Sequence, residues 1–115
     1  MGIKTYNKLV RDRIPELIEG SGNTCTTEIL SREAYLKRVD DKLDEELAEY
    51  HRDQSIEELA DLMEVIYAAA QARGYTLAQL EQVRAEKAAS RGAFRKRLLL
   101  KEVFEQEKEA RGPSR

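Results

Sequence analysis

Apolar residues recur at intervals of three and four in the middle of the chain, which is the period of one face of an α-helix. Ser31 is a residue type that caps helix N-termini, and the face that follows it consists of Leu36, Val39, Leu43, Leu47 and Tyr50. This pattern predicts a helix from about Arg32 to His51. Glu46 falls between Leu43 and Leu47 on the helical wheel, so we expect it to lean towards the packed side.

A second, wider apolar stripe follows after a short polar connection, residues 52–54. Ser55 with Glu58 three residues later fits a capping box, in which side chain and backbone bond reciprocally at a helix start. The stripe consists of Leu59, Leu62, Met63, Ile66, Tyr67 and Ala70, and it leads to Gly74. Because a short connection favours an antiparallel neighbour, we predict a helical hairpin whose second helix is the most buried of the fold.

The segment before this hairpin contains a short helix and an extended stretch. Pro15 suits the first turn of a helix from Pro15 to Glu19, which Gly20 can terminate. Residues 24–30 are rich in β-branched side chains, which predicts a short extended segment, as an isolated strand or an edge hairpin.

The segment after the hairpin begins with another capping box, Thr76 with Gln79, and the helix that it opens can end at Gly92. A basic stretch and then an apolar one follow, and periodicity alone does not decide their conformation. From residue 105 the sequence is charged and lacks core residues, which predicts a disordered tail. The whole pattern predicts an all-α helical bundle, with one domain over residues 1–104 and a tail over residues 105–115.

Composition indicates that this bundle is thin. Of 115 residues, 41% are hydrophobic and 37% are charged, and small helical bundles often complete their cores by oligomerising. We therefore expect a homodimer or a dimer of dimers. The formal net charge of -2 gives no overall attraction to nucleic acid or to an anionic membrane. With one cysteine, no apolar signal region and no membrane-spanning run, we expect a cytoplasmic protein that binds neither.

Two acidic clusters stand at the same helical spacing on either side of the predicted connection. The first is Glu45, Glu46 and Glu49, and the second is Glu57, Glu58 and Asp61. Like charges one turn apart weaken a helix by ~0.2–0.5 kcal/mol per pair, and the hairpin would bring the clusters face to face. The second cluster has no basic residue on its own helix, so its counter-charge must come from elsewhere in the fold or from solution.

A hard divalent cation would remove this repulsion. Mg²⁺ takes oxygen ligands from a few carboxylates together with substrate phosphates, and Glu46, Glu49, Glu58 and Asp61 suit that demand. Glu45 is then a spare carboxylate that could orient or deprotonate an attacking water. Cationic donors for phosphates are available before the hairpin in Lys8, Arg11 and Arg13, and after it in Lys87, Arg91, Arg95 and Arg97.

Each of these features also has a purely structural interpretation. Glu58 would serve only as a capping residue, Glu45 and Glu49 would be solvated partners of Lys42 and Arg52, and the basic runs would be solvent faces. The chain would then be a non-catalytic helical module that dimerises through the face from Leu59 to Ala70 and binds a protein. The joint pattern, E-E-x-x-E and then E-x-x-D after eight residues, is more specific than any single member.

Three blocks in the order YNKLVRDRIP, then KLDEELAEY with EELADLMEVI, then KAASRGAFRKRLLLKEV, cover Tyr6 to about Lys101. In these blocks the chain resembles the all-α nucleoside triphosphate pyrophosphohydrolases of the MazG superfamily, in particular small phosphoribosyl-ATP-pyrophosphohydrolase-like members. The resemblance implies an enzyme dependent on Mg²⁺ (or Mn²⁺) that cleaves the α–β phosphoanhydride of a nucleotide to the monophosphate and pyrophosphate. It also implies a site built between helices of associated subunits.

Carried over by position, the resemblance implies roles for particular residues. The metal ligands would be Glu46, Glu49, Glu58 and Asp61, and Glu45, Glu46 and Glu49 would be the catalytic acids. Phosphate contacts would come from Lys8, Arg11, Lys87 and Arg91. The connection between the acidic motifs is short and no motif selects a nucleobase, so we rank phosphoribosyl-ATP hydrolysis in histidine biosynthesis below a house-cleaning activity on canonical or damaged nucleotides.

Overall fold

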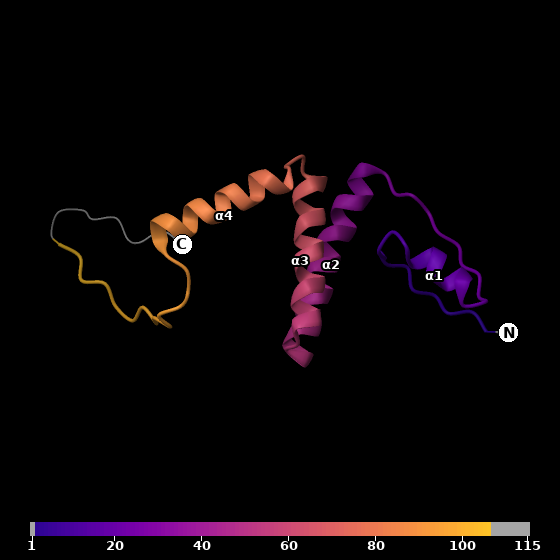
Figure 1. The fold of residues 1–115 in the computed structure, drawn as a ribbon, viewed down its shortest axis with the longest axis horizontal. Helices are drawn as coiled ribbons and strands as arrows, with labels where there is room; N and C mark the ends of the chain where they lie inside the picture. The colour runs from indigo at the N-terminus through magenta and orange to yellow at the C-terminus, as the bar shows by residue number, and fades with distance from the viewer. Residues whose placement is uncertain (1, 107–115) are drawn as a thin grey trace. The chain divides into compact units, whose positions relative to one another are not determined.

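The computed structural model describes residues 2–106, and within this range the chain forms four α-helices and no strand (Figure 1). In chain order they are α1 (Ile14–Gly20), α2 (Arg32–Asp53), α3 (Ile56–Ala72) and α4 (Leu77–Arg91). The predicted all-α class is therefore confirmed for the described residues. None of these helices is both long enough and apolar enough to span a membrane.

The helices begin where the capping residues predicted that they would. The hydroxyl groups of Ser31 and Ser55 each accept a hydrogen bond from the backbone N–H three residues further on, at 3.2 and 3.3 Å. At the start of α4, Thr76 and Gln79 form a reciprocal pair, with N–H groups donating to the partner's side-chain oxygen at 2.8 and 3.0 Å. Each bond satisfies an N–H group that has no partner within its own helix.

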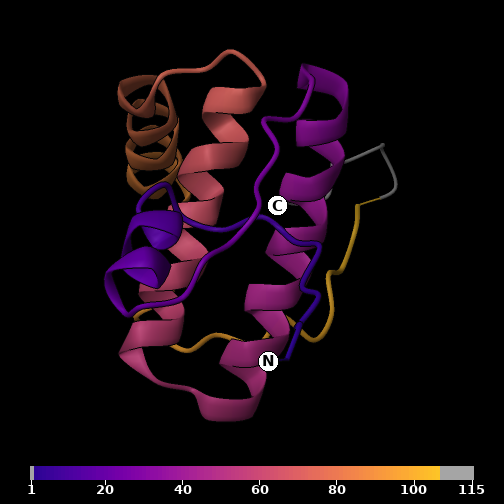
Figure 2. The same ribbon diagram turned by 90° about the vertical axis from the view of Figure 1, so that its right-hand side faces the viewer.

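α2 and α3 lie side by side and run in opposite directions (Figure 2). α2 continues to Asp53, two residues further than predicted, so that only Gln54 and Ser55 connect the helices. Gln54 adopts left-handed backbone with φ of 52°, and its N–H donates to the carbonyl of Tyr50 at 2.7 Å. Because of this tight reversal, the acids at the start of α3 lie alongside those at the end of α2.

We predicted that α3 would be the most buried helix, but the buried residues within the described range lie on α2. They are Val39, which is fully buried, and Glu46, which is 7% exposed, whereas the residues of α3 are at most half-buried. The apolar stripe of α3 is wider than the side that meets α2, so Leu59, Met63 and Ile66 remain 46%, 53% and 41% exposed. A helix that packs against one neighbour buries one side only.

The predicted strand at residues 24–30 is also wrong, because this segment contains neither helix nor strand. A strand requires a neighbour that exchanges backbone hydrogen bonds with it, and β-branched composition alone does not supply one. Ile29 is fully exposed, so its side chain has no apolar surface to cover. By contrast, α1 matches its predicted range to within one residue at each end.

The chain forms two compact units, of which the first extends to Gln82 and the second begins at Val83. The first contains α1, α2, α3 and the start of α4. In the second, residues 92–106 follow α4 without helix or strand, and apolar side chains are exposed at Phe94, Leu98, Leu99, Leu100, Val103 and Phe104. The single domain over residues 1–104 stays a prediction, and most of the predicted tail, from residue 107, lies outside the described residues.

Candidate functional site

Three of the four predicted metal ligands meet between α2 and α3. Glu46 extends from α2, Glu58 and Asp61 extend from α3, and one oxygen of each carboxylate lies within 4.8 Å of the other two. We call these three residues the acidic cluster. Glu58 and Asp61 are three residues apart and therefore share one side of α3, while the helical position of Glu46 directs it towards the packed side of α2, as predicted.

Glu49, the fourth predicted ligand, lies one turn beyond Glu46 on α2 and outside this group of three. Its side chain nevertheless interacts with those of Glu46 and Glu58, and its charge repels both. Glu57, the remaining member of the second acidic motif, is exposed. The structure thus brings the acids of the two motifs together unequally, with Glu46, Glu58 and Asp61 nearest to one another.

Burial and mutual repulsion disfavour the ionised forms of two of these acids. Burial raises the pKa of Glu46, and the interaction with Glu49 raises it further, against a weaker opposing attraction from Lys42. Desolvation likewise raises the pKa of Glu58, and the charges of Glu49, Asp53 and Asp61 add to the effect. Both shifts have the direction expected for carboxylates that lack sufficient counter-charge.

Two oxygen atoms in the acidic cluster have no hydrogen-bond partner among the described residues. They are Oε2 of Glu46 and Oε2 of Glu58, and both are buried. Leaving a buried charged acceptor unsatisfied is costly, so a cation or a proton at this place stabilises the protein. Because the donors are all carboxylate oxygens, the cluster suits a hard divalent ion such as Mg²⁺ or Mn²⁺.

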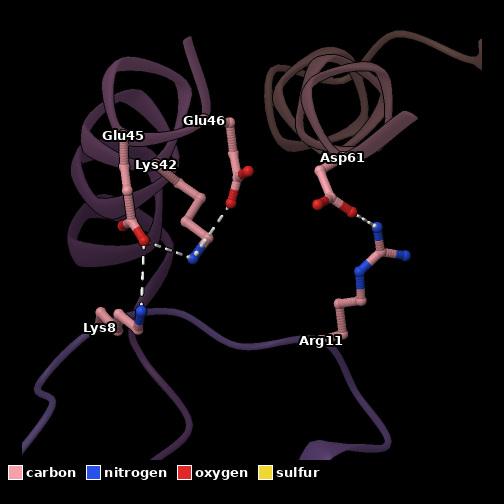
Figure 3. A network of polar contacts seen from close by, with 6 residues as sticks. All are labelled: Lys8, Arg11, Lys42, Glu45, Glu46 and Asp61. Atoms are coloured by element: carbon pink, nitrogen blue, oxygen red, sulfur yellow. Dashed lines mark hydrogen bonds and ion pairs between the residues drawn. The ribbon is translucent and has the colours of Figure 1, made fainter. Parts of the chain in front are cut away.

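Lysine side chains compensate the α2 side of the site (Figure 3). Lys42 Nζ lies 3.3 Å from Oε1 of Glu45 and 3.6 Å from Oε1 of Glu46, and Lys8 Nζ lies 3.3 Å from the same oxygen of Glu45. Burial raises the pKa of Glu45, but hydrogen bonds from Lys42 and Lys8 outweigh it and hold this pKa below its ordinary value. Glu45 is therefore ionised and engaged by two cations, which suits it to positioning Lys8 better than to taking up a proton.

The N-terminal segment supplies the counter-charge that α3 lacks. Arg11 Nη2 lies 2.7 Å from Oδ1 of Asp61 (Figure 3). Arg38 Nη1 of α2 donates to the carbonyl of Asn7 at 3.0 Å. Lys8 and Arg11, which the resemblance implies as phosphate contacts, are thus adjacent to the acids. Arg38 carries no local sequence signal of this role, because its bond to Asn7 joins residues 31 positions apart.

Lys87 and Arg91, the other implied phosphate contacts, lie one turn apart on the part of α4 that belongs to the second unit. Their role stays a prediction. Arg52, which the sequence suggested as a partner of the first acidic motif, instead pairs with Asp53 at 3.9 Å.

In comparisons with known proteins, no family model and no solved structure matches the chain. An uncharacterised protein of Mycolicibacterium smegmatis is 57% identical to it over 42 residues. This similarity covers 36% of the present chain and 43% of the relative, so the chain spans less than half of that protein. The name of this relative states no activity, so any function must be argued from the site.

Proposed function

We propose that the protein is a Mg²⁺-dependent nucleotide pyrophosphohydrolase of the MazG type, which cleaves the α–β phosphoanhydride of a nucleoside triphosphate or related nucleotide. The observation that carries the proposal is the acidic cluster, in which Glu46, Glu58 and Asp61 bring oxygens within 4.8 Å of one another. Two of its buried oxygens have no hydrogen-bond partner in the described part of the chain. The resemblance in three ordered sequence blocks supports the nucleotide as substrate.

In this proposal Glu46, Glu58 and Asp61 hold the metal, and Glu49 stands beside them. Bound Mg²⁺ neutralises charge on phosphoryl oxygens and lowers the pKa of a bound water. Glu49 has no cationic partner among the described residues, whereas Glu45 has two, so Glu49 is the better candidate to accept a proton from the attacking water. Lys8 and Arg11 place cationic donors next to the acids, where phosphates would lie.

We further propose that α2 and α3 form a helical hairpin that is completed by a second copy of the chain, as a homodimer or a dimer of dimers. An exposed stripe of three apolar residues on α3, Leu59, Met63 and Ile66, supports this, and Leu47 on α2 is 42% exposed. Surfaces of this kind on a small helical protein mark association sites.

The second candidate is a non-catalytic helical module, and the ion pairs favour it. Asp61 is paired with Arg11, and Glu45 with Lys8 and Lys42, as in a solvated network without metal. What this candidate leaves unexplained is the buried, unpartnered oxygen on each of Glu46 and Glu58.

A nucleotide panel tests the enzyme directly. Purified protein is incubated with canonical, damaged and phosphoribosyl-linked nucleotides and Mg²⁺, and the products are resolved by chromatography. The proposal expects a nucleoside monophosphate and pyrophosphate, with activity lost in Asp61→Asn and retained in Asp44→Asn, a matched change at an exposed position of α2. Turnover of no nucleotide would favour the non-catalytic module, and equal turnover by Asp61→Asn would contradict the acidic cluster as the site of the reaction.

A further inference from the structure

We propose that Arg11 is an internal counter-ion for Asp61 that a divalent cation displaces, after which its guanidinium binds the phosphates of the nucleotide. The inference rests on the proposed function and adds a regulatory step to the same site. The metal-free protein would hold its acids with its own arginine, and metal binding would release that arginine towards the substrate.

The ion pair joins two parts of the first unit that are far apart in sequence. Arg11 Nη2 lies 2.7 Å from Oδ1 of Asp61, across 50 residues of chain (Figure 3). Arg11 lies between two anchors, because Arg38 binds the carbonyl of Asn7 before it and its own carbonyl accepts a hydrogen bond from Ile14 N–H after it. The backbone is thus held at both sides, and rotation of the long side chain alone can release Asp61.

The charges around the cluster leave room for a divalent ion. Five carboxylates gather there, on Glu45, Glu46, Glu49, Glu58 and Asp61. The three cations paired with them among the described residues are Lys8, Arg11 and Lys42. With all groups ionised, two negative charges remain uncompensated, and one divalent cation would neutralise both of them. Part of this uncompensated negative charge lies inside the protein, because the side chain of Glu46 is 9% exposed and its buried Oε2 has no partner among the described residues.

Arg11 and a divalent cation would compete unequally for Asp61. The Arg11–Asp61 pair is exposed, at 58% and 41% for the two side chains, and exposed pairs contribute little to stability. A divalent ion carries twice the charge and would contact Glu46 and Glu58 as well, so it would displace the guanidinium. Once released next to the metal, the planar guanidinium of Arg11 can donate two parallel hydrogen bonds, a bidentate geometry that matches phosphate oxygens.

Calorimetric titration of the full chain with Mn²⁺, in the absence of nucleotide, tests this exchange. We expect Arg11→Gln to bind the metal about 1.4- to 5-fold more tightly than wild type, because it removes the competitor. The matched control is Arg73→Gln, which removes another exposed arginine–aspartate pair, with Asp40 at 3.4 Å, outside the acidic cluster and should leave the affinity unchanged. With Mn²⁺ saturating, Arg11→Gln should bind a non-hydrolysable nucleoside triphosphate analogue more weakly than wild type and the control variant do.

The outcomes separate this inference from the proposed function. If wild type binds no Mn²⁺, both fail. If wild type binds Mn²⁺ and Arg11→Gln binds it equally or more weakly, the exchange is overturned while the metal site stands, and Arg11 would then be a residue that orients Asp61. Circular dichroism of each variant confirms that it is folded before titration, and Arg11→Lys, which retains the charge, should fall between wild type and Arg11→Gln.

Discussion

Lys42 lies 3.6 Å from one oxygen of Glu46, while the other oxygen of the same carboxylate is buried and has no hydrogen-bond partner among residues 2–106. The lysine therefore compensates Glu46 only in part, and the remaining charge is stabilised by a proton or a cation. This half-satisfied carboxylate makes the acidic cluster sensitive both to pH and to divalent ions.

Removing the charge of Glu46 should stabilise the metal-free protein at neutral pH. The raised pKa means that the ionised form is disfavoured in the folded state, mainly by burial and by Glu49. We expect Glu46→Gln to melt at a higher temperature than wild type in EDTA at pH 7. Added Mg²⁺ should reverse the order, because only wild type would gain from binding it.

The difference between Glu46→Gln and wild type should depend on pH in one direction. As the pH falls through the raised pKa towards the ordinary value of 4.5, folded wild type takes up the proton before the unfolded chain does, and its disadvantage disappears. Glu45 acts oppositely, since its lowered pKa gives stability that is lost only at still lower pH. Thermal melts from pH 7 to 4 measure this, and a gap that widens on acidification would contradict it.

The cap at the start of α3 should matter because α3 carries two of the three clustered acids. Replacing Ser55 by Ala removes the acceptor for the Glu58 N–H and should lower the free energy of unfolding by ~0.5–2 kcal/mol. Urea denaturation measures the change. The control is Ser90→Ala on exposed α4, where the serine caps no helix start and no such loss is expected. Equal midpoints for Ser55→Ala and wild type would contradict the role of the cap.

The exposed stripe of α3 should control self-association. Met63 is 53% exposed at the centre of the stripe, so Met63→Lys should convert the oligomer to a helical monomer in sedimentation velocity. Gln71→Lys adds the same charge at an exposed position outside the stripe and should leave the oligomer intact. A wild-type protein that is monomeric at all concentrations would contradict the proposed assembly.

Local sequence patterns were sufficient for the helices and for part of the site. Ser31, Ser55 and Thr76 mark helix starts through bonds to residues three positions away, so the sequence contains both partners within one turn. The same periodicity placed Glu46 on the packed side of α2, where it is 7% exposed. These features depend on short-range geometry, which spacing encodes directly.

Long-range placement could not be obtained in this way. The contact between Arg11 and Asp61 depends on where an irregular segment crosses α2 and α3, and no local period specifies that path. Residues 24–30 had the composition of a strand but lacked a pairing partner, which only the tertiary structure supplies. The burial of α3 was overestimated for a similar reason, because a wide apolar stripe does not reveal how many neighbours cover it.

Calorimetric titration of the metal-free protein with Mg²⁺ measures whether the acids bind a divalent ion in the absence of any substrate. We expect saturable binding by wild type and by Glu57→Gln, a change outside the acidic cluster, and loss of binding in Glu58→Gln. No saturable heat with wild type, or equal binding by Glu57→Gln and Glu58→Gln, would contradict the proposed metal site.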